Sequence, residues 1–180
     1  ARLVQTEDLG KTYSTPALSY QATFDNNRRW LTFDILTGRF EESQPLWWHL
    51  LESGIARHEL ESFLTRPCVP DVLGINHYVT SDRFLDDRIE RYPAHTHGGN
   101  GRQAYADVEA VRVLEEGIPG HAGTLREAWH RYALPLAITE VHLGCTRDEQ
   151  LRWLAEAWRA ANSLRTENVD VRAITVWSLL

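Results

Sequence analysis

The sequence predicts an α/β protein built on a parallel sheet, and three observations support this fold class. Two short apolar runs, residues 70–78 and 134–140, become polar at their carboxyl ends, as strands buried on both faces of a parallel sheet do. Amphipathic stretches with helical spacing separate the runs. The chain also begins and stops inside apparent strands, at residues 1–6 and 174–180. This alternation is typical of right-handed βαβ units.

Three helices are predicted between the first two strands. The first runs from Pro16 to Gly38, because proline favours the first helical position and glycine the residue after a helix. Residues 26–29 interrupt its apolar pattern, so we expect a bend or a break there. The second and third helices are expected at residues 45–51 and 56–65.

A long polar connection follows the second strand. It spans residues 81–102 and is predicted to be a flexible loop over the strand ends. Two amphipathic helices are then expected, at residues 105–116 and 124–132.

Thr146 and Glu149 form a capping-box pattern, which predicts that the last helix begins there and leads to a strand at residues 173–180. Four strands in this order make either half of an eight-stranded barrel or a small open sheet. The strands at both ends favour a single partial domain over residues 1–180, the C-terminal half (about strands 5–8) of a (β/α)8 TIM barrel. Such a half exposes two unpaired strand edges. We therefore expect the missing N-terminal half as a partner, or self-association.

Composition and charge exclude several classes of partner. The formal net charge of −6 comes without a basic stripe, which argues against nucleic acid. No apolar run reaches the roughly 20 residues that a membrane span needs. Cys68 and Cys145 are far apart, which suits a reducing, cytoplasmic compartment. His95 and His97 lack an acidic or thiol partner at ligand spacing, so we expect neither a metal ion nor a cofactor.

Polar and aromatic side chains gather at the carboxyl ends of the predicted strands. These ends meet at one edge of a parallel sheet, where α/β barrels keep their chemistry. Glu140 is the candidate catalytic acid there, and a cap or a salt bridge to a nearby loop is the alternative. Tyr78 can hold a carboxylate through its phenolic hydrogen, whereas His77 can also be a satisfied, half-buried side chain. The other two candidates are Asn76 and Trp177.

Three stretches resemble motifs of the family 1 glycoside hydrolases, which include beta-glucosidases. Residues 74–78, G-I-N-H-Y, resemble the G-(L/I)-N-Y-Y motif on the sixth barrel strand of that family. Residues 135–140, P-L-A-I-T-E, are similar to its P-x-Y-I-T-E-N-G. Residues 176–180, V-W-S-L-L, resemble the start of its eighth-strand V-W-S-L-L-D-N-F-E-W. The resemblance covers nearly the whole chain, from the fifth barrel strand onward, and implies a carbohydrate substrate.

The resemblance also implies hydrolysis of O-glycosidic bonds by a retaining double displacement in the intact protein. Glu140 would be the nucleophile, and Tyr78 would hydrogen-bond its carboxylate. The substrate-binding positions would be Asn76, His77 and Trp177. The family's Trp-Ser pair is often joined by a cis peptide, which makes Trp177–Ser178 a candidate for one.

The chain departs from the family pattern in two places. Val141 and His142 replace the Asn-Gly that follows the nucleophile, and His77 replaces the first tyrosine of N-Y-Y. The general acid/base of the family, an N-E-P glutamate on the fourth strand, would precede Ala1. A retaining enzyme needs two carboxyl groups about 5–5.5 Å apart. This chain supplies one of them, unless Glu7 serves as the other.

Two other hypotheses remain. Family 1-like barrels also occur joined to a dTDP-4-dehydrorhamnose reductase-like domain, so the chain could be a non-catalytic module linked to nucleotide-sugar metabolism. A thiol enzyme that uses Cys145 with His142 is the other, although the sequence offers no group to orient the imidazole.

Overall fold

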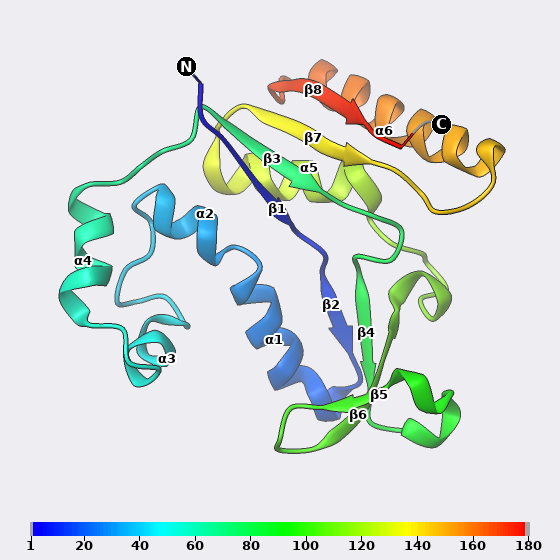
Figure 1. Ribbon diagram of the computed structural model, residues 1–180, viewed down its shortest axis with the longest axis horizontal. Helices are drawn as coiled ribbons and strands as arrows, with labels where there is room; N and C mark the ends of the chain where they lie inside the picture. Colours follow the sequence, from blue (N-terminus) through cyan, green and yellow to red (C-terminus); the bar gives the residue numbers. More distant parts are fainter. Residues whose placement is uncertain (1, 179–180) are drawn as a thin grey trace.

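The computed structural model describes residues 2–178, so Ala1, Leu179 and Leu180, which belong to the predicted end strands, lie outside the described residues. Its centre is a sheet of four strands in the order β1-β3-β7-β8 (Figure 1), and every pairing in it is parallel. The strands are β1 (Val4–Asp8), β3 (Val72–Asn76), β7 (Leu136–Val141) and β8 (Val171–Val176). The predicted α/β fold with a parallel sheet is confirmed.

Two helices cover one face of this sheet, and the main core lies between them and the strands. They are α5 (Gly120–Tyr132) and α6 (Arg147–Thr166). Leu73, Ile75 and Leu136 point toward them and are almost completely buried. Each such side chain contributes roughly 1.5–3 kcal/mol on burial. The helices supply Leu125, Ala128, Ala157 and Leu164 to this core.

The opposite face of the sheet carries small and polar side chains. A Cβ atom on Gly74 would lie 2.5 Å from Cγ2 of Thr6 and 2.8 Å from Cγ2 of Thr139, so the three residues crowd one face. On β8, the residues that alternate with the core-facing ones, Ala173 and Thr175, are exposed. The sheet is therefore covered by helices on one side and largely open on the other.

The helices between β1 and β3 follow the predicted segments. A turn of 3-10 helix (Pro16–Leu18) leads into α1 (Ser19–Arg28). The helix is then interrupted before α2 (Leu31–Leu36), as the interrupted apolar pattern predicts. Gly38 (φ 67°) and Gly54 (φ 98°) end α2 and α3 in the left-handed conformation that glycine favours. The remaining helices are α3 (Trp47–Glu52) and α4 (Arg57–Thr65).

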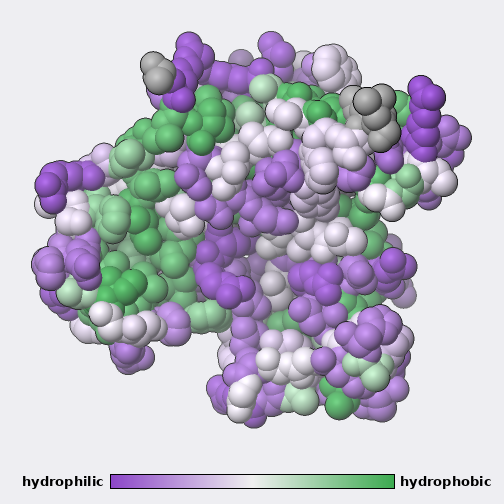
Figure 2. Space-filling model, viewed as in Figure 1, coloured by the Kyte–Doolittle hydropathy of each residue, from purple (hydrophilic) through white to green (hydrophobic). Residues whose placement is uncertain are grey.

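A second, smaller core holds this helical lobe together. Its buried members are Phe40, Leu46, Trp47 and Leu60. Figure 2 shows apolar residues gathered over the lobe of α2, α3 and α4, whereas hydrophilic residues dominate the middle of the same view.

The structure corrects the prediction for residues 81–116. Instead of a flexible loop and a helix, this stretch contributes strands to a second sheet of order β2-β4-β6-β5 (Figure 1). The strands are β2 (Thr12–Ser14), β4 (Arg83–Asp86), β5 (His97–Gly99) and β6 (Ala104–Glu109). The connecting 3-10 turns are Ile89–Arg91, Ala94–Thr96 and Ala110–Arg112. The physical reason is the two-residue spacing of Ala106 and Val108, which are buried, whereas Val111, a predicted helical position, is exposed.

The last helix begins where the capping box predicts. Oε2 of Glu149 accepts hydrogen bonds from the backbone nitrogen of Thr146 at 3.1 Å and from its Oγ1 at 2.6 Å. The helix expected at residues 124–132 begins earlier, at Gly120. Within residues 2–178, no helix is long and apolar enough to cross a membrane.

Candidate active site

Asn76 and Glu140 are register partners at the carboxyl ends of β3 and β7. The strand register shifts at this point because β7 carries a bulge. Ile138 and Val141 both pack in the helix-covered core, although residues three apart in a regular strand face opposite sides. The bulge lets the two residues between them, Thr139 and Glu140, both face away from the helices.

Tyr78 holds the Glu140 carboxylate. Its phenolic hydroxyl donates a hydrogen bond to Oε2 of Glu140. Burial, this hydrogen bond and the charge of Glu140 raise the pKa of Tyr78 to about 12, and a hydrogen bond with the Trp177 side chain acts in the opposite direction. The phenol therefore stays protonated near neutral pH and remains a donor to the carboxylate. The structure brings Glu140, Tyr78 and Trp177 together at one edge of the sheet.

Asn76 and Trp177 flank this pair. Oδ1 of Asn76 accepts a hydrogen bond from Oγ1 of Thr139 at 2.7 Å, which orients the amide. Trp177 is 45% exposed, and its ring packs on that of His142 with 4.5 Å between the ring centroids. An exposed indole beside an oriented amide and a carboxylate can bind a sugar, because the aromatic face covers the apolar face of a pyranose ring.

The Trp177–Ser178 peptide bond is trans, which corrects the cis bond expected there. None of the peptide bonds among residues 2–178 is cis. The chain turns instead at Ser178, whose φ of 53° lies in the left-handed region.

His77 lies beneath the site, and its burial corrects its assignment as a substrate-binding residue. The side chain is 0% exposed, so it offers no surface to a ligand. Its Nε2 lies 3.4 Å from Oδ2 of Asp82, and its ring packs 5.6 Å from that of His121 and 6.4 Å from that of Trp153. The reason is strand alternation: Tyr78 faces Glu140, so its neighbour faces the helices. His77 is a packing residue, more deeply buried than the half-buried alternative.

His121 is expected to make stability depend on pH. Burial, and then the nearby His77, lower the pKa of His121 to about 3 from an ordinary 6.5. Between these values the unfolded chain binds a proton that the folded chain does not. The neutral His121 side chain therefore makes its full contribution to the free energy of unfolding above about pH 6.5, and this contribution is lost as the pH falls toward 3. At about pH 5 we expect a loss of about 2 kcal/mol.

Urea unfolding of the wild type and of His121→Phe, each at about pH 7.5 and pH 5, measures this effect. The midpoint of the variant should change less between the two pH values than that of the wild type. Equal changes would show that His121 is not the group responsible.

The two acids at the end of β1 face opposite sides of the sheet. Leu9 packs in the helix-covered core, so Glu7, two residues earlier, faces that side and Asp8 faces the Glu140 side. Glu7 also accepts a hydrogen bond from Nε2 of Gln5 at 3.1 Å. Its position argues against Glu7 as the second carboxyl group of a catalytic pair.

Two alternative chemistries concern the pair His95 and His97 and the pair Cys145 and His142. His95 and His97 are exposed, and Nε2 of His97 lies 2.9 Å from a backbone carbonyl. Over the described range, 2–178, no group of three His, Cys, Asp or Glu side chains is placed to hold a metal ion. Burial raises the pKa of the Cys145 thiol, which disfavours the reactive thiolate. His142, its proposed base, packs on Trp177.

Two further residues, Ser81 and Asp82, support the turn that carries Tyr78 and are not among the candidates that the sequence predicts. Ser81 falls in the stretch expected to be a flexible loop, yet its Oγ accepts a hydrogen bond from the Tyr78 backbone nitrogen at 3.0 Å. Asp82 is 2% exposed, and its Oδ1 accepts a hydrogen bond from the backbone nitrogen of Lys11 at 2.6 Å. The available signal is a serine and an aspartate soon after a strand, since both residue types hydrogen-bond nearby backbone.

The fold resembles part of several solved glycosidase structures. The chain superposes on a beta-glucosidase from Thermotoga maritima, in complex with a substituted glucoimidazole, with a TM-score of 0.67 and 14% identity. For a beta-glucosidase from Exiguobacterium marinum these values are 0.61 and 16%, and for the AHE enzyme from Alicyclobacillus herbarius 0.61 and 17%. The matches cover 99–100% of this chain but 41–42% of the other chains. No family model and no curated protein matches the sequence.

At this level of identity the comparison concerns the fold. The resemblance to beta-glucosidases that the sequence motifs indicate is confirmed in the fold of the whole chain, which spans about two fifths of the length of those structures.

Proposed function

We propose that the protein hydrolyses O-glycosidic bonds by a retaining double displacement, with Glu140 as the nucleophile. The observation that carries this proposal is the hydrogen bond from Tyr78 to the Glu140 carboxylate at the carboxyl edge of a parallel sheet. The likeness of the fold to part of several beta-glucosidases supports it.

The site suits the first chemical step. Tyr78 occupies Oε2 of Glu140, so Oε1 attacks the anomeric carbon and forms the glycosyl-enzyme bond while the leaving oxygen takes a proton from a general acid. Water then attacks the anomeric carbon and gives its proton to the base left by that general acid, and the Glu140 carboxylate departs. The exposed face of Trp177 receives the apolar side of the sugar ring.

The second carboxyl group of the pair comes, in this proposal, from outside these 180 residues. Asp8 lies on the open face of the sheet, as Glu140 does. Asp8 pairs in register with Asn76, and Asn76 with Glu140, so one strand separates the two acids. Strands are spaced by about 4.8 Å, so the two backbones are about 10 Å apart, whereas a retaining pair needs about 5–5.5 Å between carboxyl groups.

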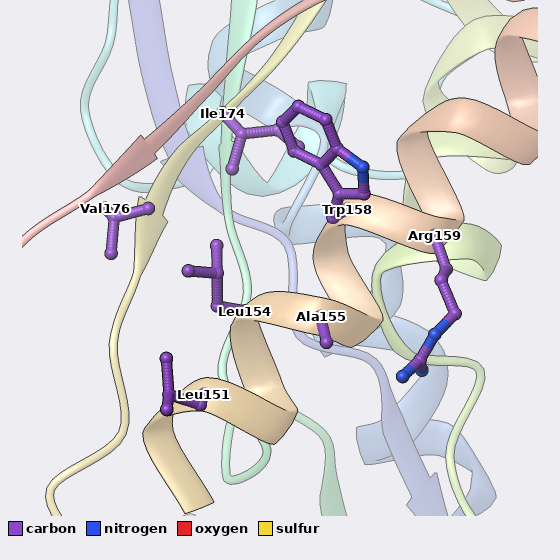
Figure 3. A pocket seen from close by; sticks show the side chains of 7 residues that line it. All are labelled: Leu151, Leu154, Ala155, Trp158, Arg159, Ile174 and Val176. Carbon is purple, nitrogen blue, oxygen red and sulfur yellow. The ribbon is translucent and has the colours of Figure 1, made fainter. Parts of the chain in front are cut away.

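An apolar groove beside β8 supports completion of the barrel by further strands and helices. β8 is an edge strand, and a groove of about 510 Å³ runs between it and α6 (Figure 3). Its lining residues are Leu151, Leu154, Ala155, Trp158, Arg159, Ile174 and Val176. Trp158 is 61% exposed in the groove. We assign the groove to the next βα unit of the barrel, whose strand pairs with β8 and whose helix covers α6.

Without that unit the 180-residue chain is expected to associate. Light scattering should report a mass above that of the monomer, and Trp158→Gln should shift the distribution toward the monomer because it removes exposed apolar surface. The control is Trp48→Gln, since Trp48 is 53% exposed on α3, away from the groove. A wild-type chain that stays monomeric would contradict the assignment.

Trapping of the covalent intermediate tests the mechanism. The complete protein is incubated with an aryl glycoside fluorinated at the 2-position, which slows release of the sugar more than its attachment. Mass spectrometry should find one glycosyl group on the peptide that contains Glu140, and none in Glu140→Gln. A turnover-competent protein that shows no adduct would rule out the double displacement, and a protein without turnover would favour the non-catalytic module.

A further inference from the structure

We propose that Ser81 is a positioning residue for the candidate active site. It fixes the backbone of Tyr78, which holds Glu140, and it is itself fixed by Asp8 at the end of β1. The inference deepens the proposed function and rests on it for the catalytic consequence. The positioning itself can be measured without any substrate.

Ser81 makes hydrogen bonds to Asp8 and to Tyr78 through its hydroxyl and its backbone nitrogen. A serine hydroxyl has a single proton, and Ser81 donates it to Oδ2 of Asp8 at 2.8 Å. The lone pairs of the same oxygen accept the backbone N–H of Tyr78 at 3.0 Å. The backbone nitrogen of Ser81 donates in return to the carbonyl of Tyr78 at 3.1 Å. The turn is thus closed on both sides, and Tyr78 has little freedom to rotate about its backbone.

Asp8 is held in place from its own strand end. Its Oδ1 accepts the backbone N–H of Gly10 at 2.9 Å, so each carboxylate oxygen has a donor. The linker after β1 also approaches the turn closely: a Cβ atom on Gly10 would lie 2.1 Å from the carbonyl oxygen of Ser81. Only a residue without a side chain permits this contact, which places the linker after β1 against the turn that carries Ser81.

Asp82 anchors the same turn on the other flank of Tyr78. It accepts the Lys11 backbone N–H at 2.6 Å and lies 3.4 Å from the imidazole of His77. Both Asp82 and His77 are almost fully buried. The turn is therefore tied to the end of β1 through Ser81 and to the linker after β1 through Asp82.

These contacts connect the carboxyl ends of three neighbouring strands, β1, β3 and β7. Asp8, Asn76 and Glu140 are register partners across β1, β3 and β7. Ser81 bridges the first gap, and Tyr78 bridges the second. Loss of the Ser81 hydroxyl is expected to release the turn, so that the phenol leaves the carboxylate for part of the time.

The ionisation of Tyr78 measures this directly. Carbon-13 NMR of tyrosine-labelled chain follows the ring carbon that bears the hydroxyl, with Tyr78→Phe for assignment. In Ser81→Ala, which changes no charge, we expect the pKa of Tyr78 to fall from about 12 toward its ordinary 10. The control is Thr80→Ala, a change at an exposed position on the same turn, which should leave the pKa of Tyr78 unchanged. A pKa that stays at about 12 in Ser81→Ala overturns the proposal.

A second pair of variants covers the case in which Ser81→Ala does not fold. The negative charge of Asp8 raises the pKa of Tyr78. Asp8→Asn and Asp8→Ala both remove this charge, so the two variants differ only in the acceptor that they offer to Ser81. Asparagine keeps an acceptor oxygen for Ser81, and alanine does not. We expect the lower Tyr78 pKa in Asp8→Ala, and equal values in the two variants overturn the proposal.

Kinetics of the complete protein separate this inference from the proposed function. In this proposal Ser81 acts through Tyr78 and not on the substrate, so Ser81→Ala should lower kcat by about tenfold and leave KM unchanged. A lowered Tyr78 pKa without any change in kcat would confirm the positioning and contradict the role of Glu140. A raised KM with unchanged kcat would instead make Ser81 a binding residue and overturn the assignment.

Discussion

Glu140→Gln is expected to lower kcat of the complete protein on an aryl glycoside by at least about 10⁴-fold. Glutamine keeps the size of the side chain and can still accept the hydrogen bond from Tyr78, but its amide cannot form the glycosyl-enzyme bond. The loss should therefore fall on kcat rather than on KM. Initial rates at saturating and limiting substrate measure the two constants.

The matched control for this experiment is Glu115→Gln, the same chemical change at an exposed acid outside the site. It should leave both constants unchanged. If Glu140→Gln and the wild type have equal rates, Glu140 has no part in the reaction, and the non-catalytic module becomes the better hypothesis.

Gly10→Ala is expected to be among the most destabilising conservative changes in the chain. Its Cβ would lie 2.1 Å from a backbone oxygen, that of Ser81, which cannot rotate away as a flexible side chain can. One of the two linkers has to move, at a cost of about 2–3 kcal/mol, which lowers Tm by about 4–12 °C. Thermal unfolding followed by circular dichroism gives the difference.

Gly144→Ala is the control, because nothing lies within 4 Å of the added carbon and the residue does not have a positive φ. Its Tm should stay the same or rise slightly, since alanine reduces the freedom of the unfolded chain. A loss for Gly10→Ala no larger than that for Gly144→Ala would show that the two linkers are not packed as described.

The parts of the fold that the sequence predicts are those with a local signal. β3 and β7 are continuous apolar runs that end in polar residues, the glycines at 38 and 54 stop their helices, and the pair Thr146 and Glu149 marks the start of α6. Each of these features depends on neighbours in the sequence, so a single sequence reveals it.

The second sheet has no comparable signal. β2 covers three residues and pairs with β4, far along the chain, so its stability comes from contacts that no local pattern encodes. The alternation in β6 is short and overlaps with helical spacing, so the pattern of residues 105–116 also predicts a helix.

The candidate site shows the same division. The positions of Asn76, Glu140 and Tyr78 at one edge follow from strand ends that the sequence marks. His77 is buried because it lies on the helix-covered side of the sheet, and Glu140 faces the open side because β7 carries a bulge. Neither feature can be predicted from the residue type alone.

The continuation of β1 and β3 beyond the first sheet has a consequence for access to the site. Each strand passes through a short linker into a strand of the second sheet, and these strands, β2 and β4, also run parallel. On that side of Glu140 the two linkers therefore lie between two parallel strand pairs, β1 with β3 and β2 with β4. Under the proposed function, a sugar is therefore expected to approach Glu140 from the side that carries His142 and Trp177, after β7 and β8.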